Sequence, residues 1–219
     1  MPITLASLVD RAARLAAGPG RAVLGVTGSP GAGKSTLVEV LLRELPTDEV
    51  AHVPMDGFHL ADVALRRLGR LAAKGAPDTF DAGGYVALLR RLRADAEDVI
   101  YAPAFERDLE QPLAGAIAVP RQARLVITEG NYLLAEQGRW AEVRPELAEV
   151  WFCDADPQRR MAQLIARHIE FGKEPEFARA WVQAVDEGNA TLVESTRSLA
   201  DLIVPAALLA GLEPDQLQP

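Results

Sequence analysis

The sequence has only one cysteine and no long apolar run, and these absences exclude several kinds of protein. With Cys153 alone, neither an internal disulfide nor a metal site built from cysteines can form. No stretch approaches the roughly 20 apolar residues that cross a bilayer. Residues 1–17 also lack the charged-then-apolar pattern of a secretory signal. We therefore expect a cytoplasmic protein without a membrane partner.

The chain also lacks an excess of basic residues. It has 31 acidic against 23 basic residues, which gives a formal net charge of −8. General nucleic-acid binding needs a basic face toward the phosphates, so no nucleic-acid partner is expected. A local basic pocket for a phosphorylated ligand stays compatible with this balance. Composition and length are those of a globular chain with a sizeable core.

Apolar runs alternate with amphipathic segments along the chain. Strands are expected at 21–27, 50–55, 99–101, 116–119, 124–129, 149–154 and 201–205. Helices are expected at 3–17, 34–45, 61–73, 84–95, 156–171 and 176–195. Between the third and fourth strands, 102–115 is interpreted as a polar loop. The alternation predicts an α/β fold, with a parallel sheet flanked by helices on both faces.

A glycine-rich segment follows the first expected strand and opens a helix. It matches the phosphate-loop (P-loop) pattern G-x-x-x-x-G-K-[ST] in full and comprises Gly28, Ser29, Pro30, Gly31, Ala32, Gly33, Lys34 and Ser35, with Thr36 after it. Glycines let backbone N–H groups approach phosphate oxygens, and the helix N-terminus favours an anion. Lys34 would reach the β- and γ-phosphates, and the Ser35 hydroxyl would bind Mg²⁺. The strand–loop–helix context disfavours a fortuitous turn, so ATP and Mg²⁺ are the expected cofactors.

Two acidic residues end apolar strands, where parallel strands point into a ligand crevice. Asp56 could accept the proton of an attacking hydroxyl or hold Mg²⁺ through water. Its alternative role, an N-cap for the helix near Ala61, would come five residues too early. Glu129 ends its strand at the usual place of a metal-associated acid. Since a lone buried carboxylate is costly, an acid at the end of so apolar a strand is expected to have a role. Both are candidates for catalysis and for the metal site.

Other polar residues near these strand ends have weaker claims. Asp154 and Asp156 precede an expected helix and are interpreted as structural, since N-capping explains them. His59 follows Asp56 by three residues, and a substrate-facing position and a structural one are equally favoured. His52 lies within a strand and is interpreted as structural. No N-K-x-D segment is present, which counts against a GTPase.

Together these segments resemble the phosphoribulokinase/uridine kinase family of P-loop kinases, including its pantothenate kinase branch. Within that group the chain looks most like bacterial proteins described as sugar kinases associated with fructose transport. The resemblance covers about 21–204 and depends on four blocks: 28–36, 55–59, 75–81 and 128–134. It implies a P-loop kinase fold with a small helical lid. Related kinases are often dimers, so a homodimer is one expectation.

The resemblance also implies roles for individual residues. Asp56 would be the general base, Lys34 and Glu129 would belong to the catalytic centre, and lid arginines would close on the phosphates. The inward-facing lid candidates are Arg160, which would bind the nucleotide, Arg167 and His168, whereas Arg159 is interpreted as solvated. The candidates for substrate contact are Phe58, His59, Glu106, Arg107, Asn131 and Tyr132. We expect one kinase domain over 1–219, with an N-terminal helix in 1–20, a catalytic core over 21–205 and the lid near 156–175.

The acceptor is the least determined feature. Uridine kinases carry a histidine in the base-recognition loop, and the matching segment here, 101–108, has none. The sugar-kinase-like branch has a similar Pro-Ala-Phe-acid-Arg run, which favours a small polyhydroxylated acceptor such as a fructose-like sugar. A nucleoside or pantothenate kinase stays open as an alternative. So does an ATP-binding regulator that has no phospho-acceptor.

Overall fold

The fold is built on a five-stranded parallel sheet. The structure, a computed structural model, describes residues 2–170, 172, 174–183 and 187–212. The strand order is β2-β5-β1-β6-β7, and every pairing in this sheet is parallel. The strands are β1 Ala22–Thr27, β2 Val50–His52, β5 Leu125–Glu129, β6 Glu149–Cys153 and β7 Leu202–Val204. The predicted α/β fold with a parallel sheet is confirmed.

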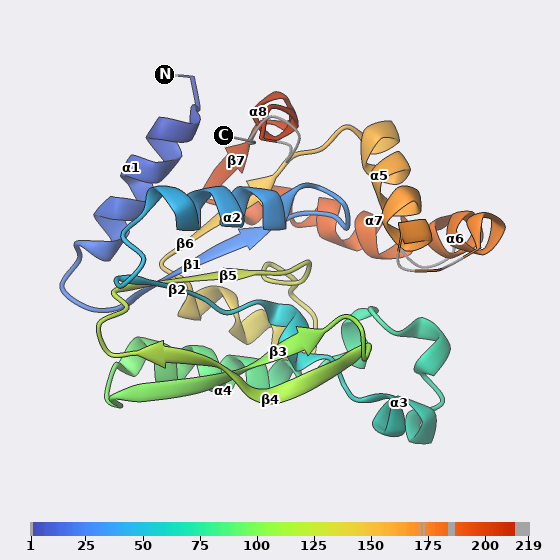
Figure 1. The fold of residues 1–219 in the computed structure, drawn as a ribbon, viewed down its shortest axis with the longest axis horizontal. Helices are drawn as coiled ribbons and strands as arrows, with labels where there is room; N and C mark the ends of the chain where they lie inside the picture. The colour runs from blue at the N-terminus through green and yellow to red at the C-terminus, as the bar shows by residue number, and fades with distance from the viewer. Residues whose placement is uncertain (1, 171, 173, 184–186, 213–219) are drawn as a thin grey trace.

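Helices cover both faces of this sheet (Figure 1). The helices of the structure are α1 Leu5–Ala16, α2 Lys34–Glu44, α3 Asp62–Leu68, α4 Ala82–Ala94, α5 Pro157–Glu170, α6 Pro175–Trp181, α7 Glu187–Ser195 and α8 Ala206–Ala210, of which α3 and α6 lie away from the sheet. One core lies between α1, α2 and the sheet, and a second lies on the α4 side, where Tyr85 and Trp140 are buried. Burial on both faces explains why the strands read as continuous apolar runs. No helix in the described ranges has the length and apolar character needed to span a membrane.

The region between α4 and β5 differs from expectation. In place of two short strands and a polar loop, the chain forms an antiparallel hairpin of β3 Val99–Glu106 and β4 Gln111–Pro120. The loop prediction for 102–115 was therefore wrong. A register shift between Ala102 and Ala104 accommodates Pro103, which cannot donate a ladder hydrogen bond. Buried Ile100 and Val119 attach the hairpin to the α4-side core.

Two expected helices are each divided in the structure. The segment expected as a helix over 61–73 contains α3 and a short 3-10 turn, Leu71–Ala73, separated at Gly69. Gly69 has φ +67°, the left-handed conformation that ends helices and that glycine adopts without strain. The segment expected over 176–195 contains α6 and α7. Two further 3-10 turns, Met55–Phe58 (η1) and Pro77–Thr79, lie beside the carboxyl ends of the strands.

Candidate active site

The phosphate loop connects β1 to α2 and depends on glycine backbone geometry. Gly31 has φ +78° and Gly33 has φ +79°, conformations in which other residues are strained. Gly28 has φ +148°, and a Cβ there would lie 2.7 Å from the carbonyl oxygen of Cys153. Helix α2 begins at Lys34 without a side-chain cap, so its first N–H groups suit an anion. The local sequence thus forms a phosphate cradle at the end of β1.

Two cations fix the carbonyl groups of this loop. Lys34 Nζ donates to the carbonyls of Gly28 at 2.9 Å and Ser29 at 3.0 Å. Arg160 Nη1, on α5, donates to the carbonyl of Pro30 at 3.3 Å. Three successive carbonyls of the cradle are therefore held by cationic side chains. Charged donors make stronger hydrogen bonds than neutral ones, so these contacts stabilise the curvature of the loop.

Glu129 lies at the end of β5 and joins the phosphate loop to β2. Its Oε2 accepts a hydrogen bond of 2.9 Å from the Ser35 hydroxyl, and its Oε1 lies 3.3 Å from His52 Nε2. Burial raises the pKa of Glu129, but His52, the Lys34 charge and the Ser35 hydrogen bond together hold that pKa below its ordinary value. The net effect is a buried carboxylate that stays ionised at neutral pH.

The Ser35–Glu129 pair fits a magnesium ion chemically. Mg²⁺ prefers hard oxygen donors and is commonly held by one or two carboxylates together with substrate phosphates. A hydroxyl and an ionised carboxylate lie 2.9 Å apart at the start of α2. When bound, the ion would neutralise charge on the phosphates. Ser35 and Glu129 would hold it here.

Asp56 lies in η1, beyond the end of β2, and belongs to an aromatic environment. The backbone carbonyl of Asp56 accepts from His59 Nδ1 at 2.8 Å, and the Asp56 charge acts on both His59 and Tyr85. The His59 ring stacks on Phe80 at 4.0 Å and on Phe105 at 4.7 Å between ring centroids. Burial lowers the pKa of His59, so its imidazole is neutral at physiological pH.

The buried Tyr85 supports this region from below. The Thr128 hydroxyl donates to the Val53 carbonyl at 2.6 Å, so the Tyr85 hydroxyl must donate to Thr128 Oγ1, also at 2.6 Å. Burial raises the pKa of Tyr85 strongly, and the phenol stays protonated. This chain of hydrogen bonds connects Tyr85 of α4, Thr128 of β5 and Val53, just after β2 and before Asp56.

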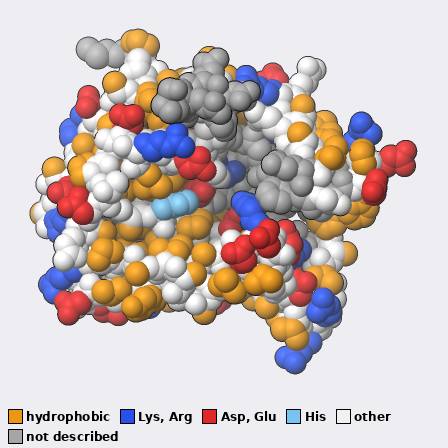
Figure 2. Space-filling model, viewed as in Figure 1, with side chains coloured by type: hydrophobic (Ala, Val, Ile, Leu, Met, Phe, Trp, Pro, Cys, Tyr) orange, Lys and Arg blue, Asp and Glu red, His pale blue; other side chains and the backbone are white. Residues whose placement is uncertain are grey.

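A cavity of about 840 Å³ opens over the phosphate loop. Figure 2 shows a hollow in this face of the molecule, with acidic and basic side chains around it. Its apolar wall consists of Leu164 of α5 and of Ala206, Ala207, Leu209 and Ala210 of α8. Its polar lining includes Lys34, Ser35, Thr36, Glu39, Arg107, Asp154, Asp156, Arg159, Arg160 and Gln163. A cavity with one apolar end and one cationic end suits a nucleotide.

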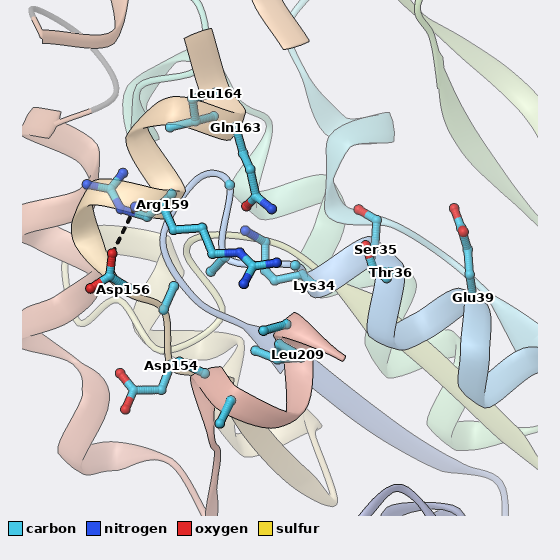
Figure 3. Close-up of a pocket in the computed structure, with 18 of the residues that line it drawn as sticks. Lys34, Ser35, Thr36, Glu39, Asp154, Asp156, Arg159, Gln163, Leu164 and Leu209 are labelled. Atoms are coloured by element: carbon cyan, nitrogen blue, oxygen red, sulfur yellow. Dashed lines mark hydrogen bonds between the residues drawn. The ribbon is translucent and has the colours of Figure 1, made fainter. Parts of the chain in front are cut away.

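Two adjacent arginines of α5, Arg159 and Arg160, have different surroundings. Arg159, interpreted from sequence as solvated, extends across the phosphate loop toward Lys34 (Figure 3). The Arg160 side chain is 6% exposed and forms an ion pair with Glu187 of α7. Arg160 thus touches the loop backbone and an acid, although it also borders the cavity. The side chains of Arg167 and His168 lie outside the described residues.

The remaining residues predicted to contact the substrate lie in different surroundings. Tyr132 is fully buried, and its hydroxyl donates to the Gly75 carbonyl at 2.5 Å, so the expected substrate contact by this side chain is not what the structure shows. Asn131 is partly buried and lies next to the end of β1, where its backbone carbonyl accepts a hydrogen bond from the Thr27 hydroxyl. Phe58 packs on Tyr85 with ring centroids 5.1 Å apart. Glu106 and Arg107 lie at the tip of the hairpin, and only Arg107 lines the cavity.

Of the two acids interpreted as N-caps, only Asp156 caps the helix, and both border the cavity. Asp156 immediately precedes α5, and its Oδ1 accepts from the backbone N–H of Arg159 at 2.9 Å, which confirms the N-cap. Asp154 forms an ion pair with Arg197 at 3.1 Å. Sequence reasoning missed two contacts to the site. One is His52 beside Glu129, and the other is Glu194, which accepts a hydrogen bond of 2.5 Å from the Ser29 hydroxyl.

Comparisons with known proteins agree with this geometry. The crystal structure of a "putative fructose transport system kinase" from Silicibacter sp. TM1040 is 34% identical, has a TM-score of 0.85, and covers 93% of this chain and 100% of its own. The "Uncharacterized protein YggC" of Escherichia coli K12 is 34% identical over 84% of this chain and 77% of its own length. A Schizosaccharomyces pombe protein named "Putative uridine kinase C227.14" is 29% identical over 96% of this chain and 94% of its own.

One family model, "Methylmalonyl Co-A mutase-associated GTPase MeaB", matches residues 6–56. That span contains most of α1, the phosphate loop and β2 but ends before Glu129 and α5. The full-length relatives decide the assignment: the chain belongs to the phosphoribulokinase/uridine kinase family of P-loop kinases. It is an ATP-binding phosphotransferase that acts on a small molecule.

Proposed function

We propose that this kinase transfers the γ-phosphate of Mg-ATP to a hydroxyl of a small polyhydroxylated metabolite, such as a fructose-like sugar. The observation that supports this most is the meeting of three elements at one edge of the sheet. The phosphate loop follows β1, Glu129 ends β5 and contacts Ser35 of α2, and Asp56 follows β2. The carboxyl end of the sheet would thus offer a phosphate cradle, a hydroxyl and a carboxylate that could hold Mg²⁺, and a second carboxylate for the acceptor proton.

On the donor side, each residue has a role that follows from its chemistry. Lys34 would exchange the carbonyls of Gly28 and Ser29 for the β- and γ-phosphate oxygens. Arg159 would stabilise charge on the transferring group, because a guanidinium matches phosphate oxygens and stays ionised. Arg160 would hold the loop rather than the nucleotide.

On the acceptor side, Asp56 would accept the hydroxyl proton as the phosphoryl group transfers. A neutral His59 suits this position, because it can accept or donate a hydrogen bond to a hydroxyl without a charge that would compete with Asp56. Arg107, at the tip of the hairpin, is proposed to contact either the acceptor or the nucleotide. The same proposal treats residues 1–219 as one kinase domain whose lid lies at about 156–175.

The sugar assignment is favoured by two features. The hairpin segment lacks the histidine of uridine kinases, and a full-length relative at 34% identity carries a fructose-related name. A second candidate is a uridine-type nucleoside acceptor, since the Schizosaccharomyces pombe relative is named a uridine kinase. An ATP-binding regulator without acceptor is the third.

The test is ADP release from Mg-ATP against sugars, sugar acids, nucleosides, pantothenate and small alcohols. The reaction without acceptor and the Lys34→Ala variant run as controls. Release stimulated by a sugar and lost in the variant supports the proposal, whereas stimulation by nucleosides alone replaces the sugar with the second candidate. ATP binding with no stimulation across the whole panel favours the regulator.

A further inference from the structure

His52 lies next to Glu129 because of the strand register. In the parallel pair β2–β5, His52 is opposite Ile127, and Glu129 lies two residues further along β5. Side chains two residues apart share one face of a strand, so His52, Ile127 and Glu129 all point to the α2 side of the sheet. That is the side from which Ser35 approaches. The neighbourhood therefore follows from the fold and not from an accident of rotamers.

Each oxygen of the Glu129 carboxylate has its own neighbour. Oε2 accepts from Ser35 at 2.9 Å, while Oε1 lies 3.3 Å from His52 Nε2. Nε2 is shielded from solvent and makes no hydrogen bond of good geometry within the described part of the chain. The Glu129 carboxylate, at 3.3 Å, is an acceptor within reach of this nitrogen. A buried nitrogen without a hydrogen bond costs free energy, and a hydrogen bond to the Glu129 carboxylate would remove that cost.

Resting on the proposed function, we infer that His52 is a positioning residue, which fixes the Glu129 carboxylate so that Oε2 faces Ser35 and the metal side of the phosphate loop. Imidazole nitrogen is a poor ligand for Mg²⁺, so His52 acts through Glu129 and not on the ion. If Ser35 turned toward a bound Mg²⁺, the carboxylate would lose its contact at Oε2. The His52 contact at Oε1 would then keep the side chain from rotating away. Partners that orient a metal-binding carboxylate typically matter by about 10- to 100-fold in metal affinity.

The experiment measures ATP binding while Mg²⁺ is titrated, in the wild type and in the His52→Phe and His52→Gln variants. Phenylalanine keeps a planar ring without a donor, whereas glutamine keeps an N–H donor. We expect His52→Phe to need about tenfold more Mg²⁺ for half-maximal binding, and His52→Gln to stay within about threefold of the wild type. ATP binding in EDTA should change less than about twofold in both.

A wild-type Mg²⁺ requirement in His52→Phe overturns the inference. So does an equal loss in both variants, or an equal loss in EDTA, because these would assign His52 to packing alone. Thermal unfolding of each variant is measured in parallel, and His52→Leu replaces His52→Phe if the latter does not fold. Lys34→Ala separates the two proposals: if it abolishes Mg-ATP binding while His52→Phe changes nothing, the nucleotide site stands and only the role of His52 fails.

Discussion

The donor side and the acceptor side of this kinase are built in different ways. On the donor side, one contiguous segment, Gly28 to Thr36, supplies the cradle, and charged side chains surround it. On the acceptor side, η1, the loop near Lys74, Phe80 and the hairpin residue Phe105 come together by packing. The donor side thus depends on backbone geometry and charge. The acceptor side of the proposed function depends on aromatic contacts between segments that are distant in sequence, and under that proposal it would set specificity toward the metabolite.

The largest expected effect lies at the boundary between the two sides. Asp56→Asn should lower acceptor-stimulated turnover by about 10²- to 10⁴-fold, because the amide cannot accept the hydroxyl proton. Mg-ATP affinity should stay within about twofold, since the phosphate loop is untouched. ADP release and calorimetry measure the two quantities. Asp98→Asn, at a carboxylate 94% exposed, is the matched control. Turnover within tenfold of the wild type would remove Asp56 from the proton transfer.

The next effect tests the backbone of the donor side. Gly28→Ala places a Cβ at φ +148° and 2.7 Å from a carbonyl oxygen, so both strain and a clash oppose it. We expect a loss of about 1–3 kcal/mol in the free energy of unfolding and loss of ATP binding. Gly188→Ala, where a Cβ meets nothing within 4 Å, should be neutral or slightly stabilising in α7. Equal effects of the two substitutions on thermal unfolding and ATP binding would contradict the role given to Gly28.

The third effect separates two adjacent arginines. Arg160→Ala removes a buried guanidinium and leaves the Pro30 carbonyl and Glu187 without this partner, so it should lower stability by about 2–4 kcal/mol. Arg159→Ala, at an exposed side chain, should change stability by less than about 0.5 kcal/mol but lower turnover by at least about tenfold. Chemical denaturation and kinetics measure both. If the effects are exchanged between the two variants, the assignment of Arg159 to the phosphates is wrong.

The same contrast explains what sequence could predict. The α/β fold and the phosphate loop were predictable because strand periodicity and the glycine pattern are local signals. The hairpin was missed, since 102–115 was interpreted as a polar loop between two short strands, whereas a register shift accommodates Pro103 within one continuous strand. The burial of Tyr132 in a turn and the position of the exposed Arg159 over the cavity depend on tertiary packing, which short-range patterns do not determine. The His52–Glu129 contact depends on the pairing of two strands some 75 residues apart in the chain, which only the folded sheet supplies.

The smallest effect concerns Cys153, which lies beneath Gly28 on the donor side. Burial raises the pKa of the Cys153 thiol from 9.0 to about 12. The unfolded thiol ionises near its ordinary pKa while the folded one does not, so its contribution to stability is present below pH 9 and is lost as the pH rises from 9 toward 12. At pH 10 this loss is about 1.4 kcal/mol. Urea unfolding of Cys153→Ala should therefore show a flatter decline between pH 8.5 and pH 10 than the wild type, although the variant is less stable at pH 7 because a cavity replaces the sulfur. Tyr85→Phe is the matching change beneath the acceptor side, and it should flatten the decline only above pH 10, where an ordinary phenol ionises. If Cys153→Ala leaves the slope below pH 10 unchanged, the thiol is not titrating with the unfolding of the donor side, and the support beneath the phosphate loop opens independently of the rest of the sheet.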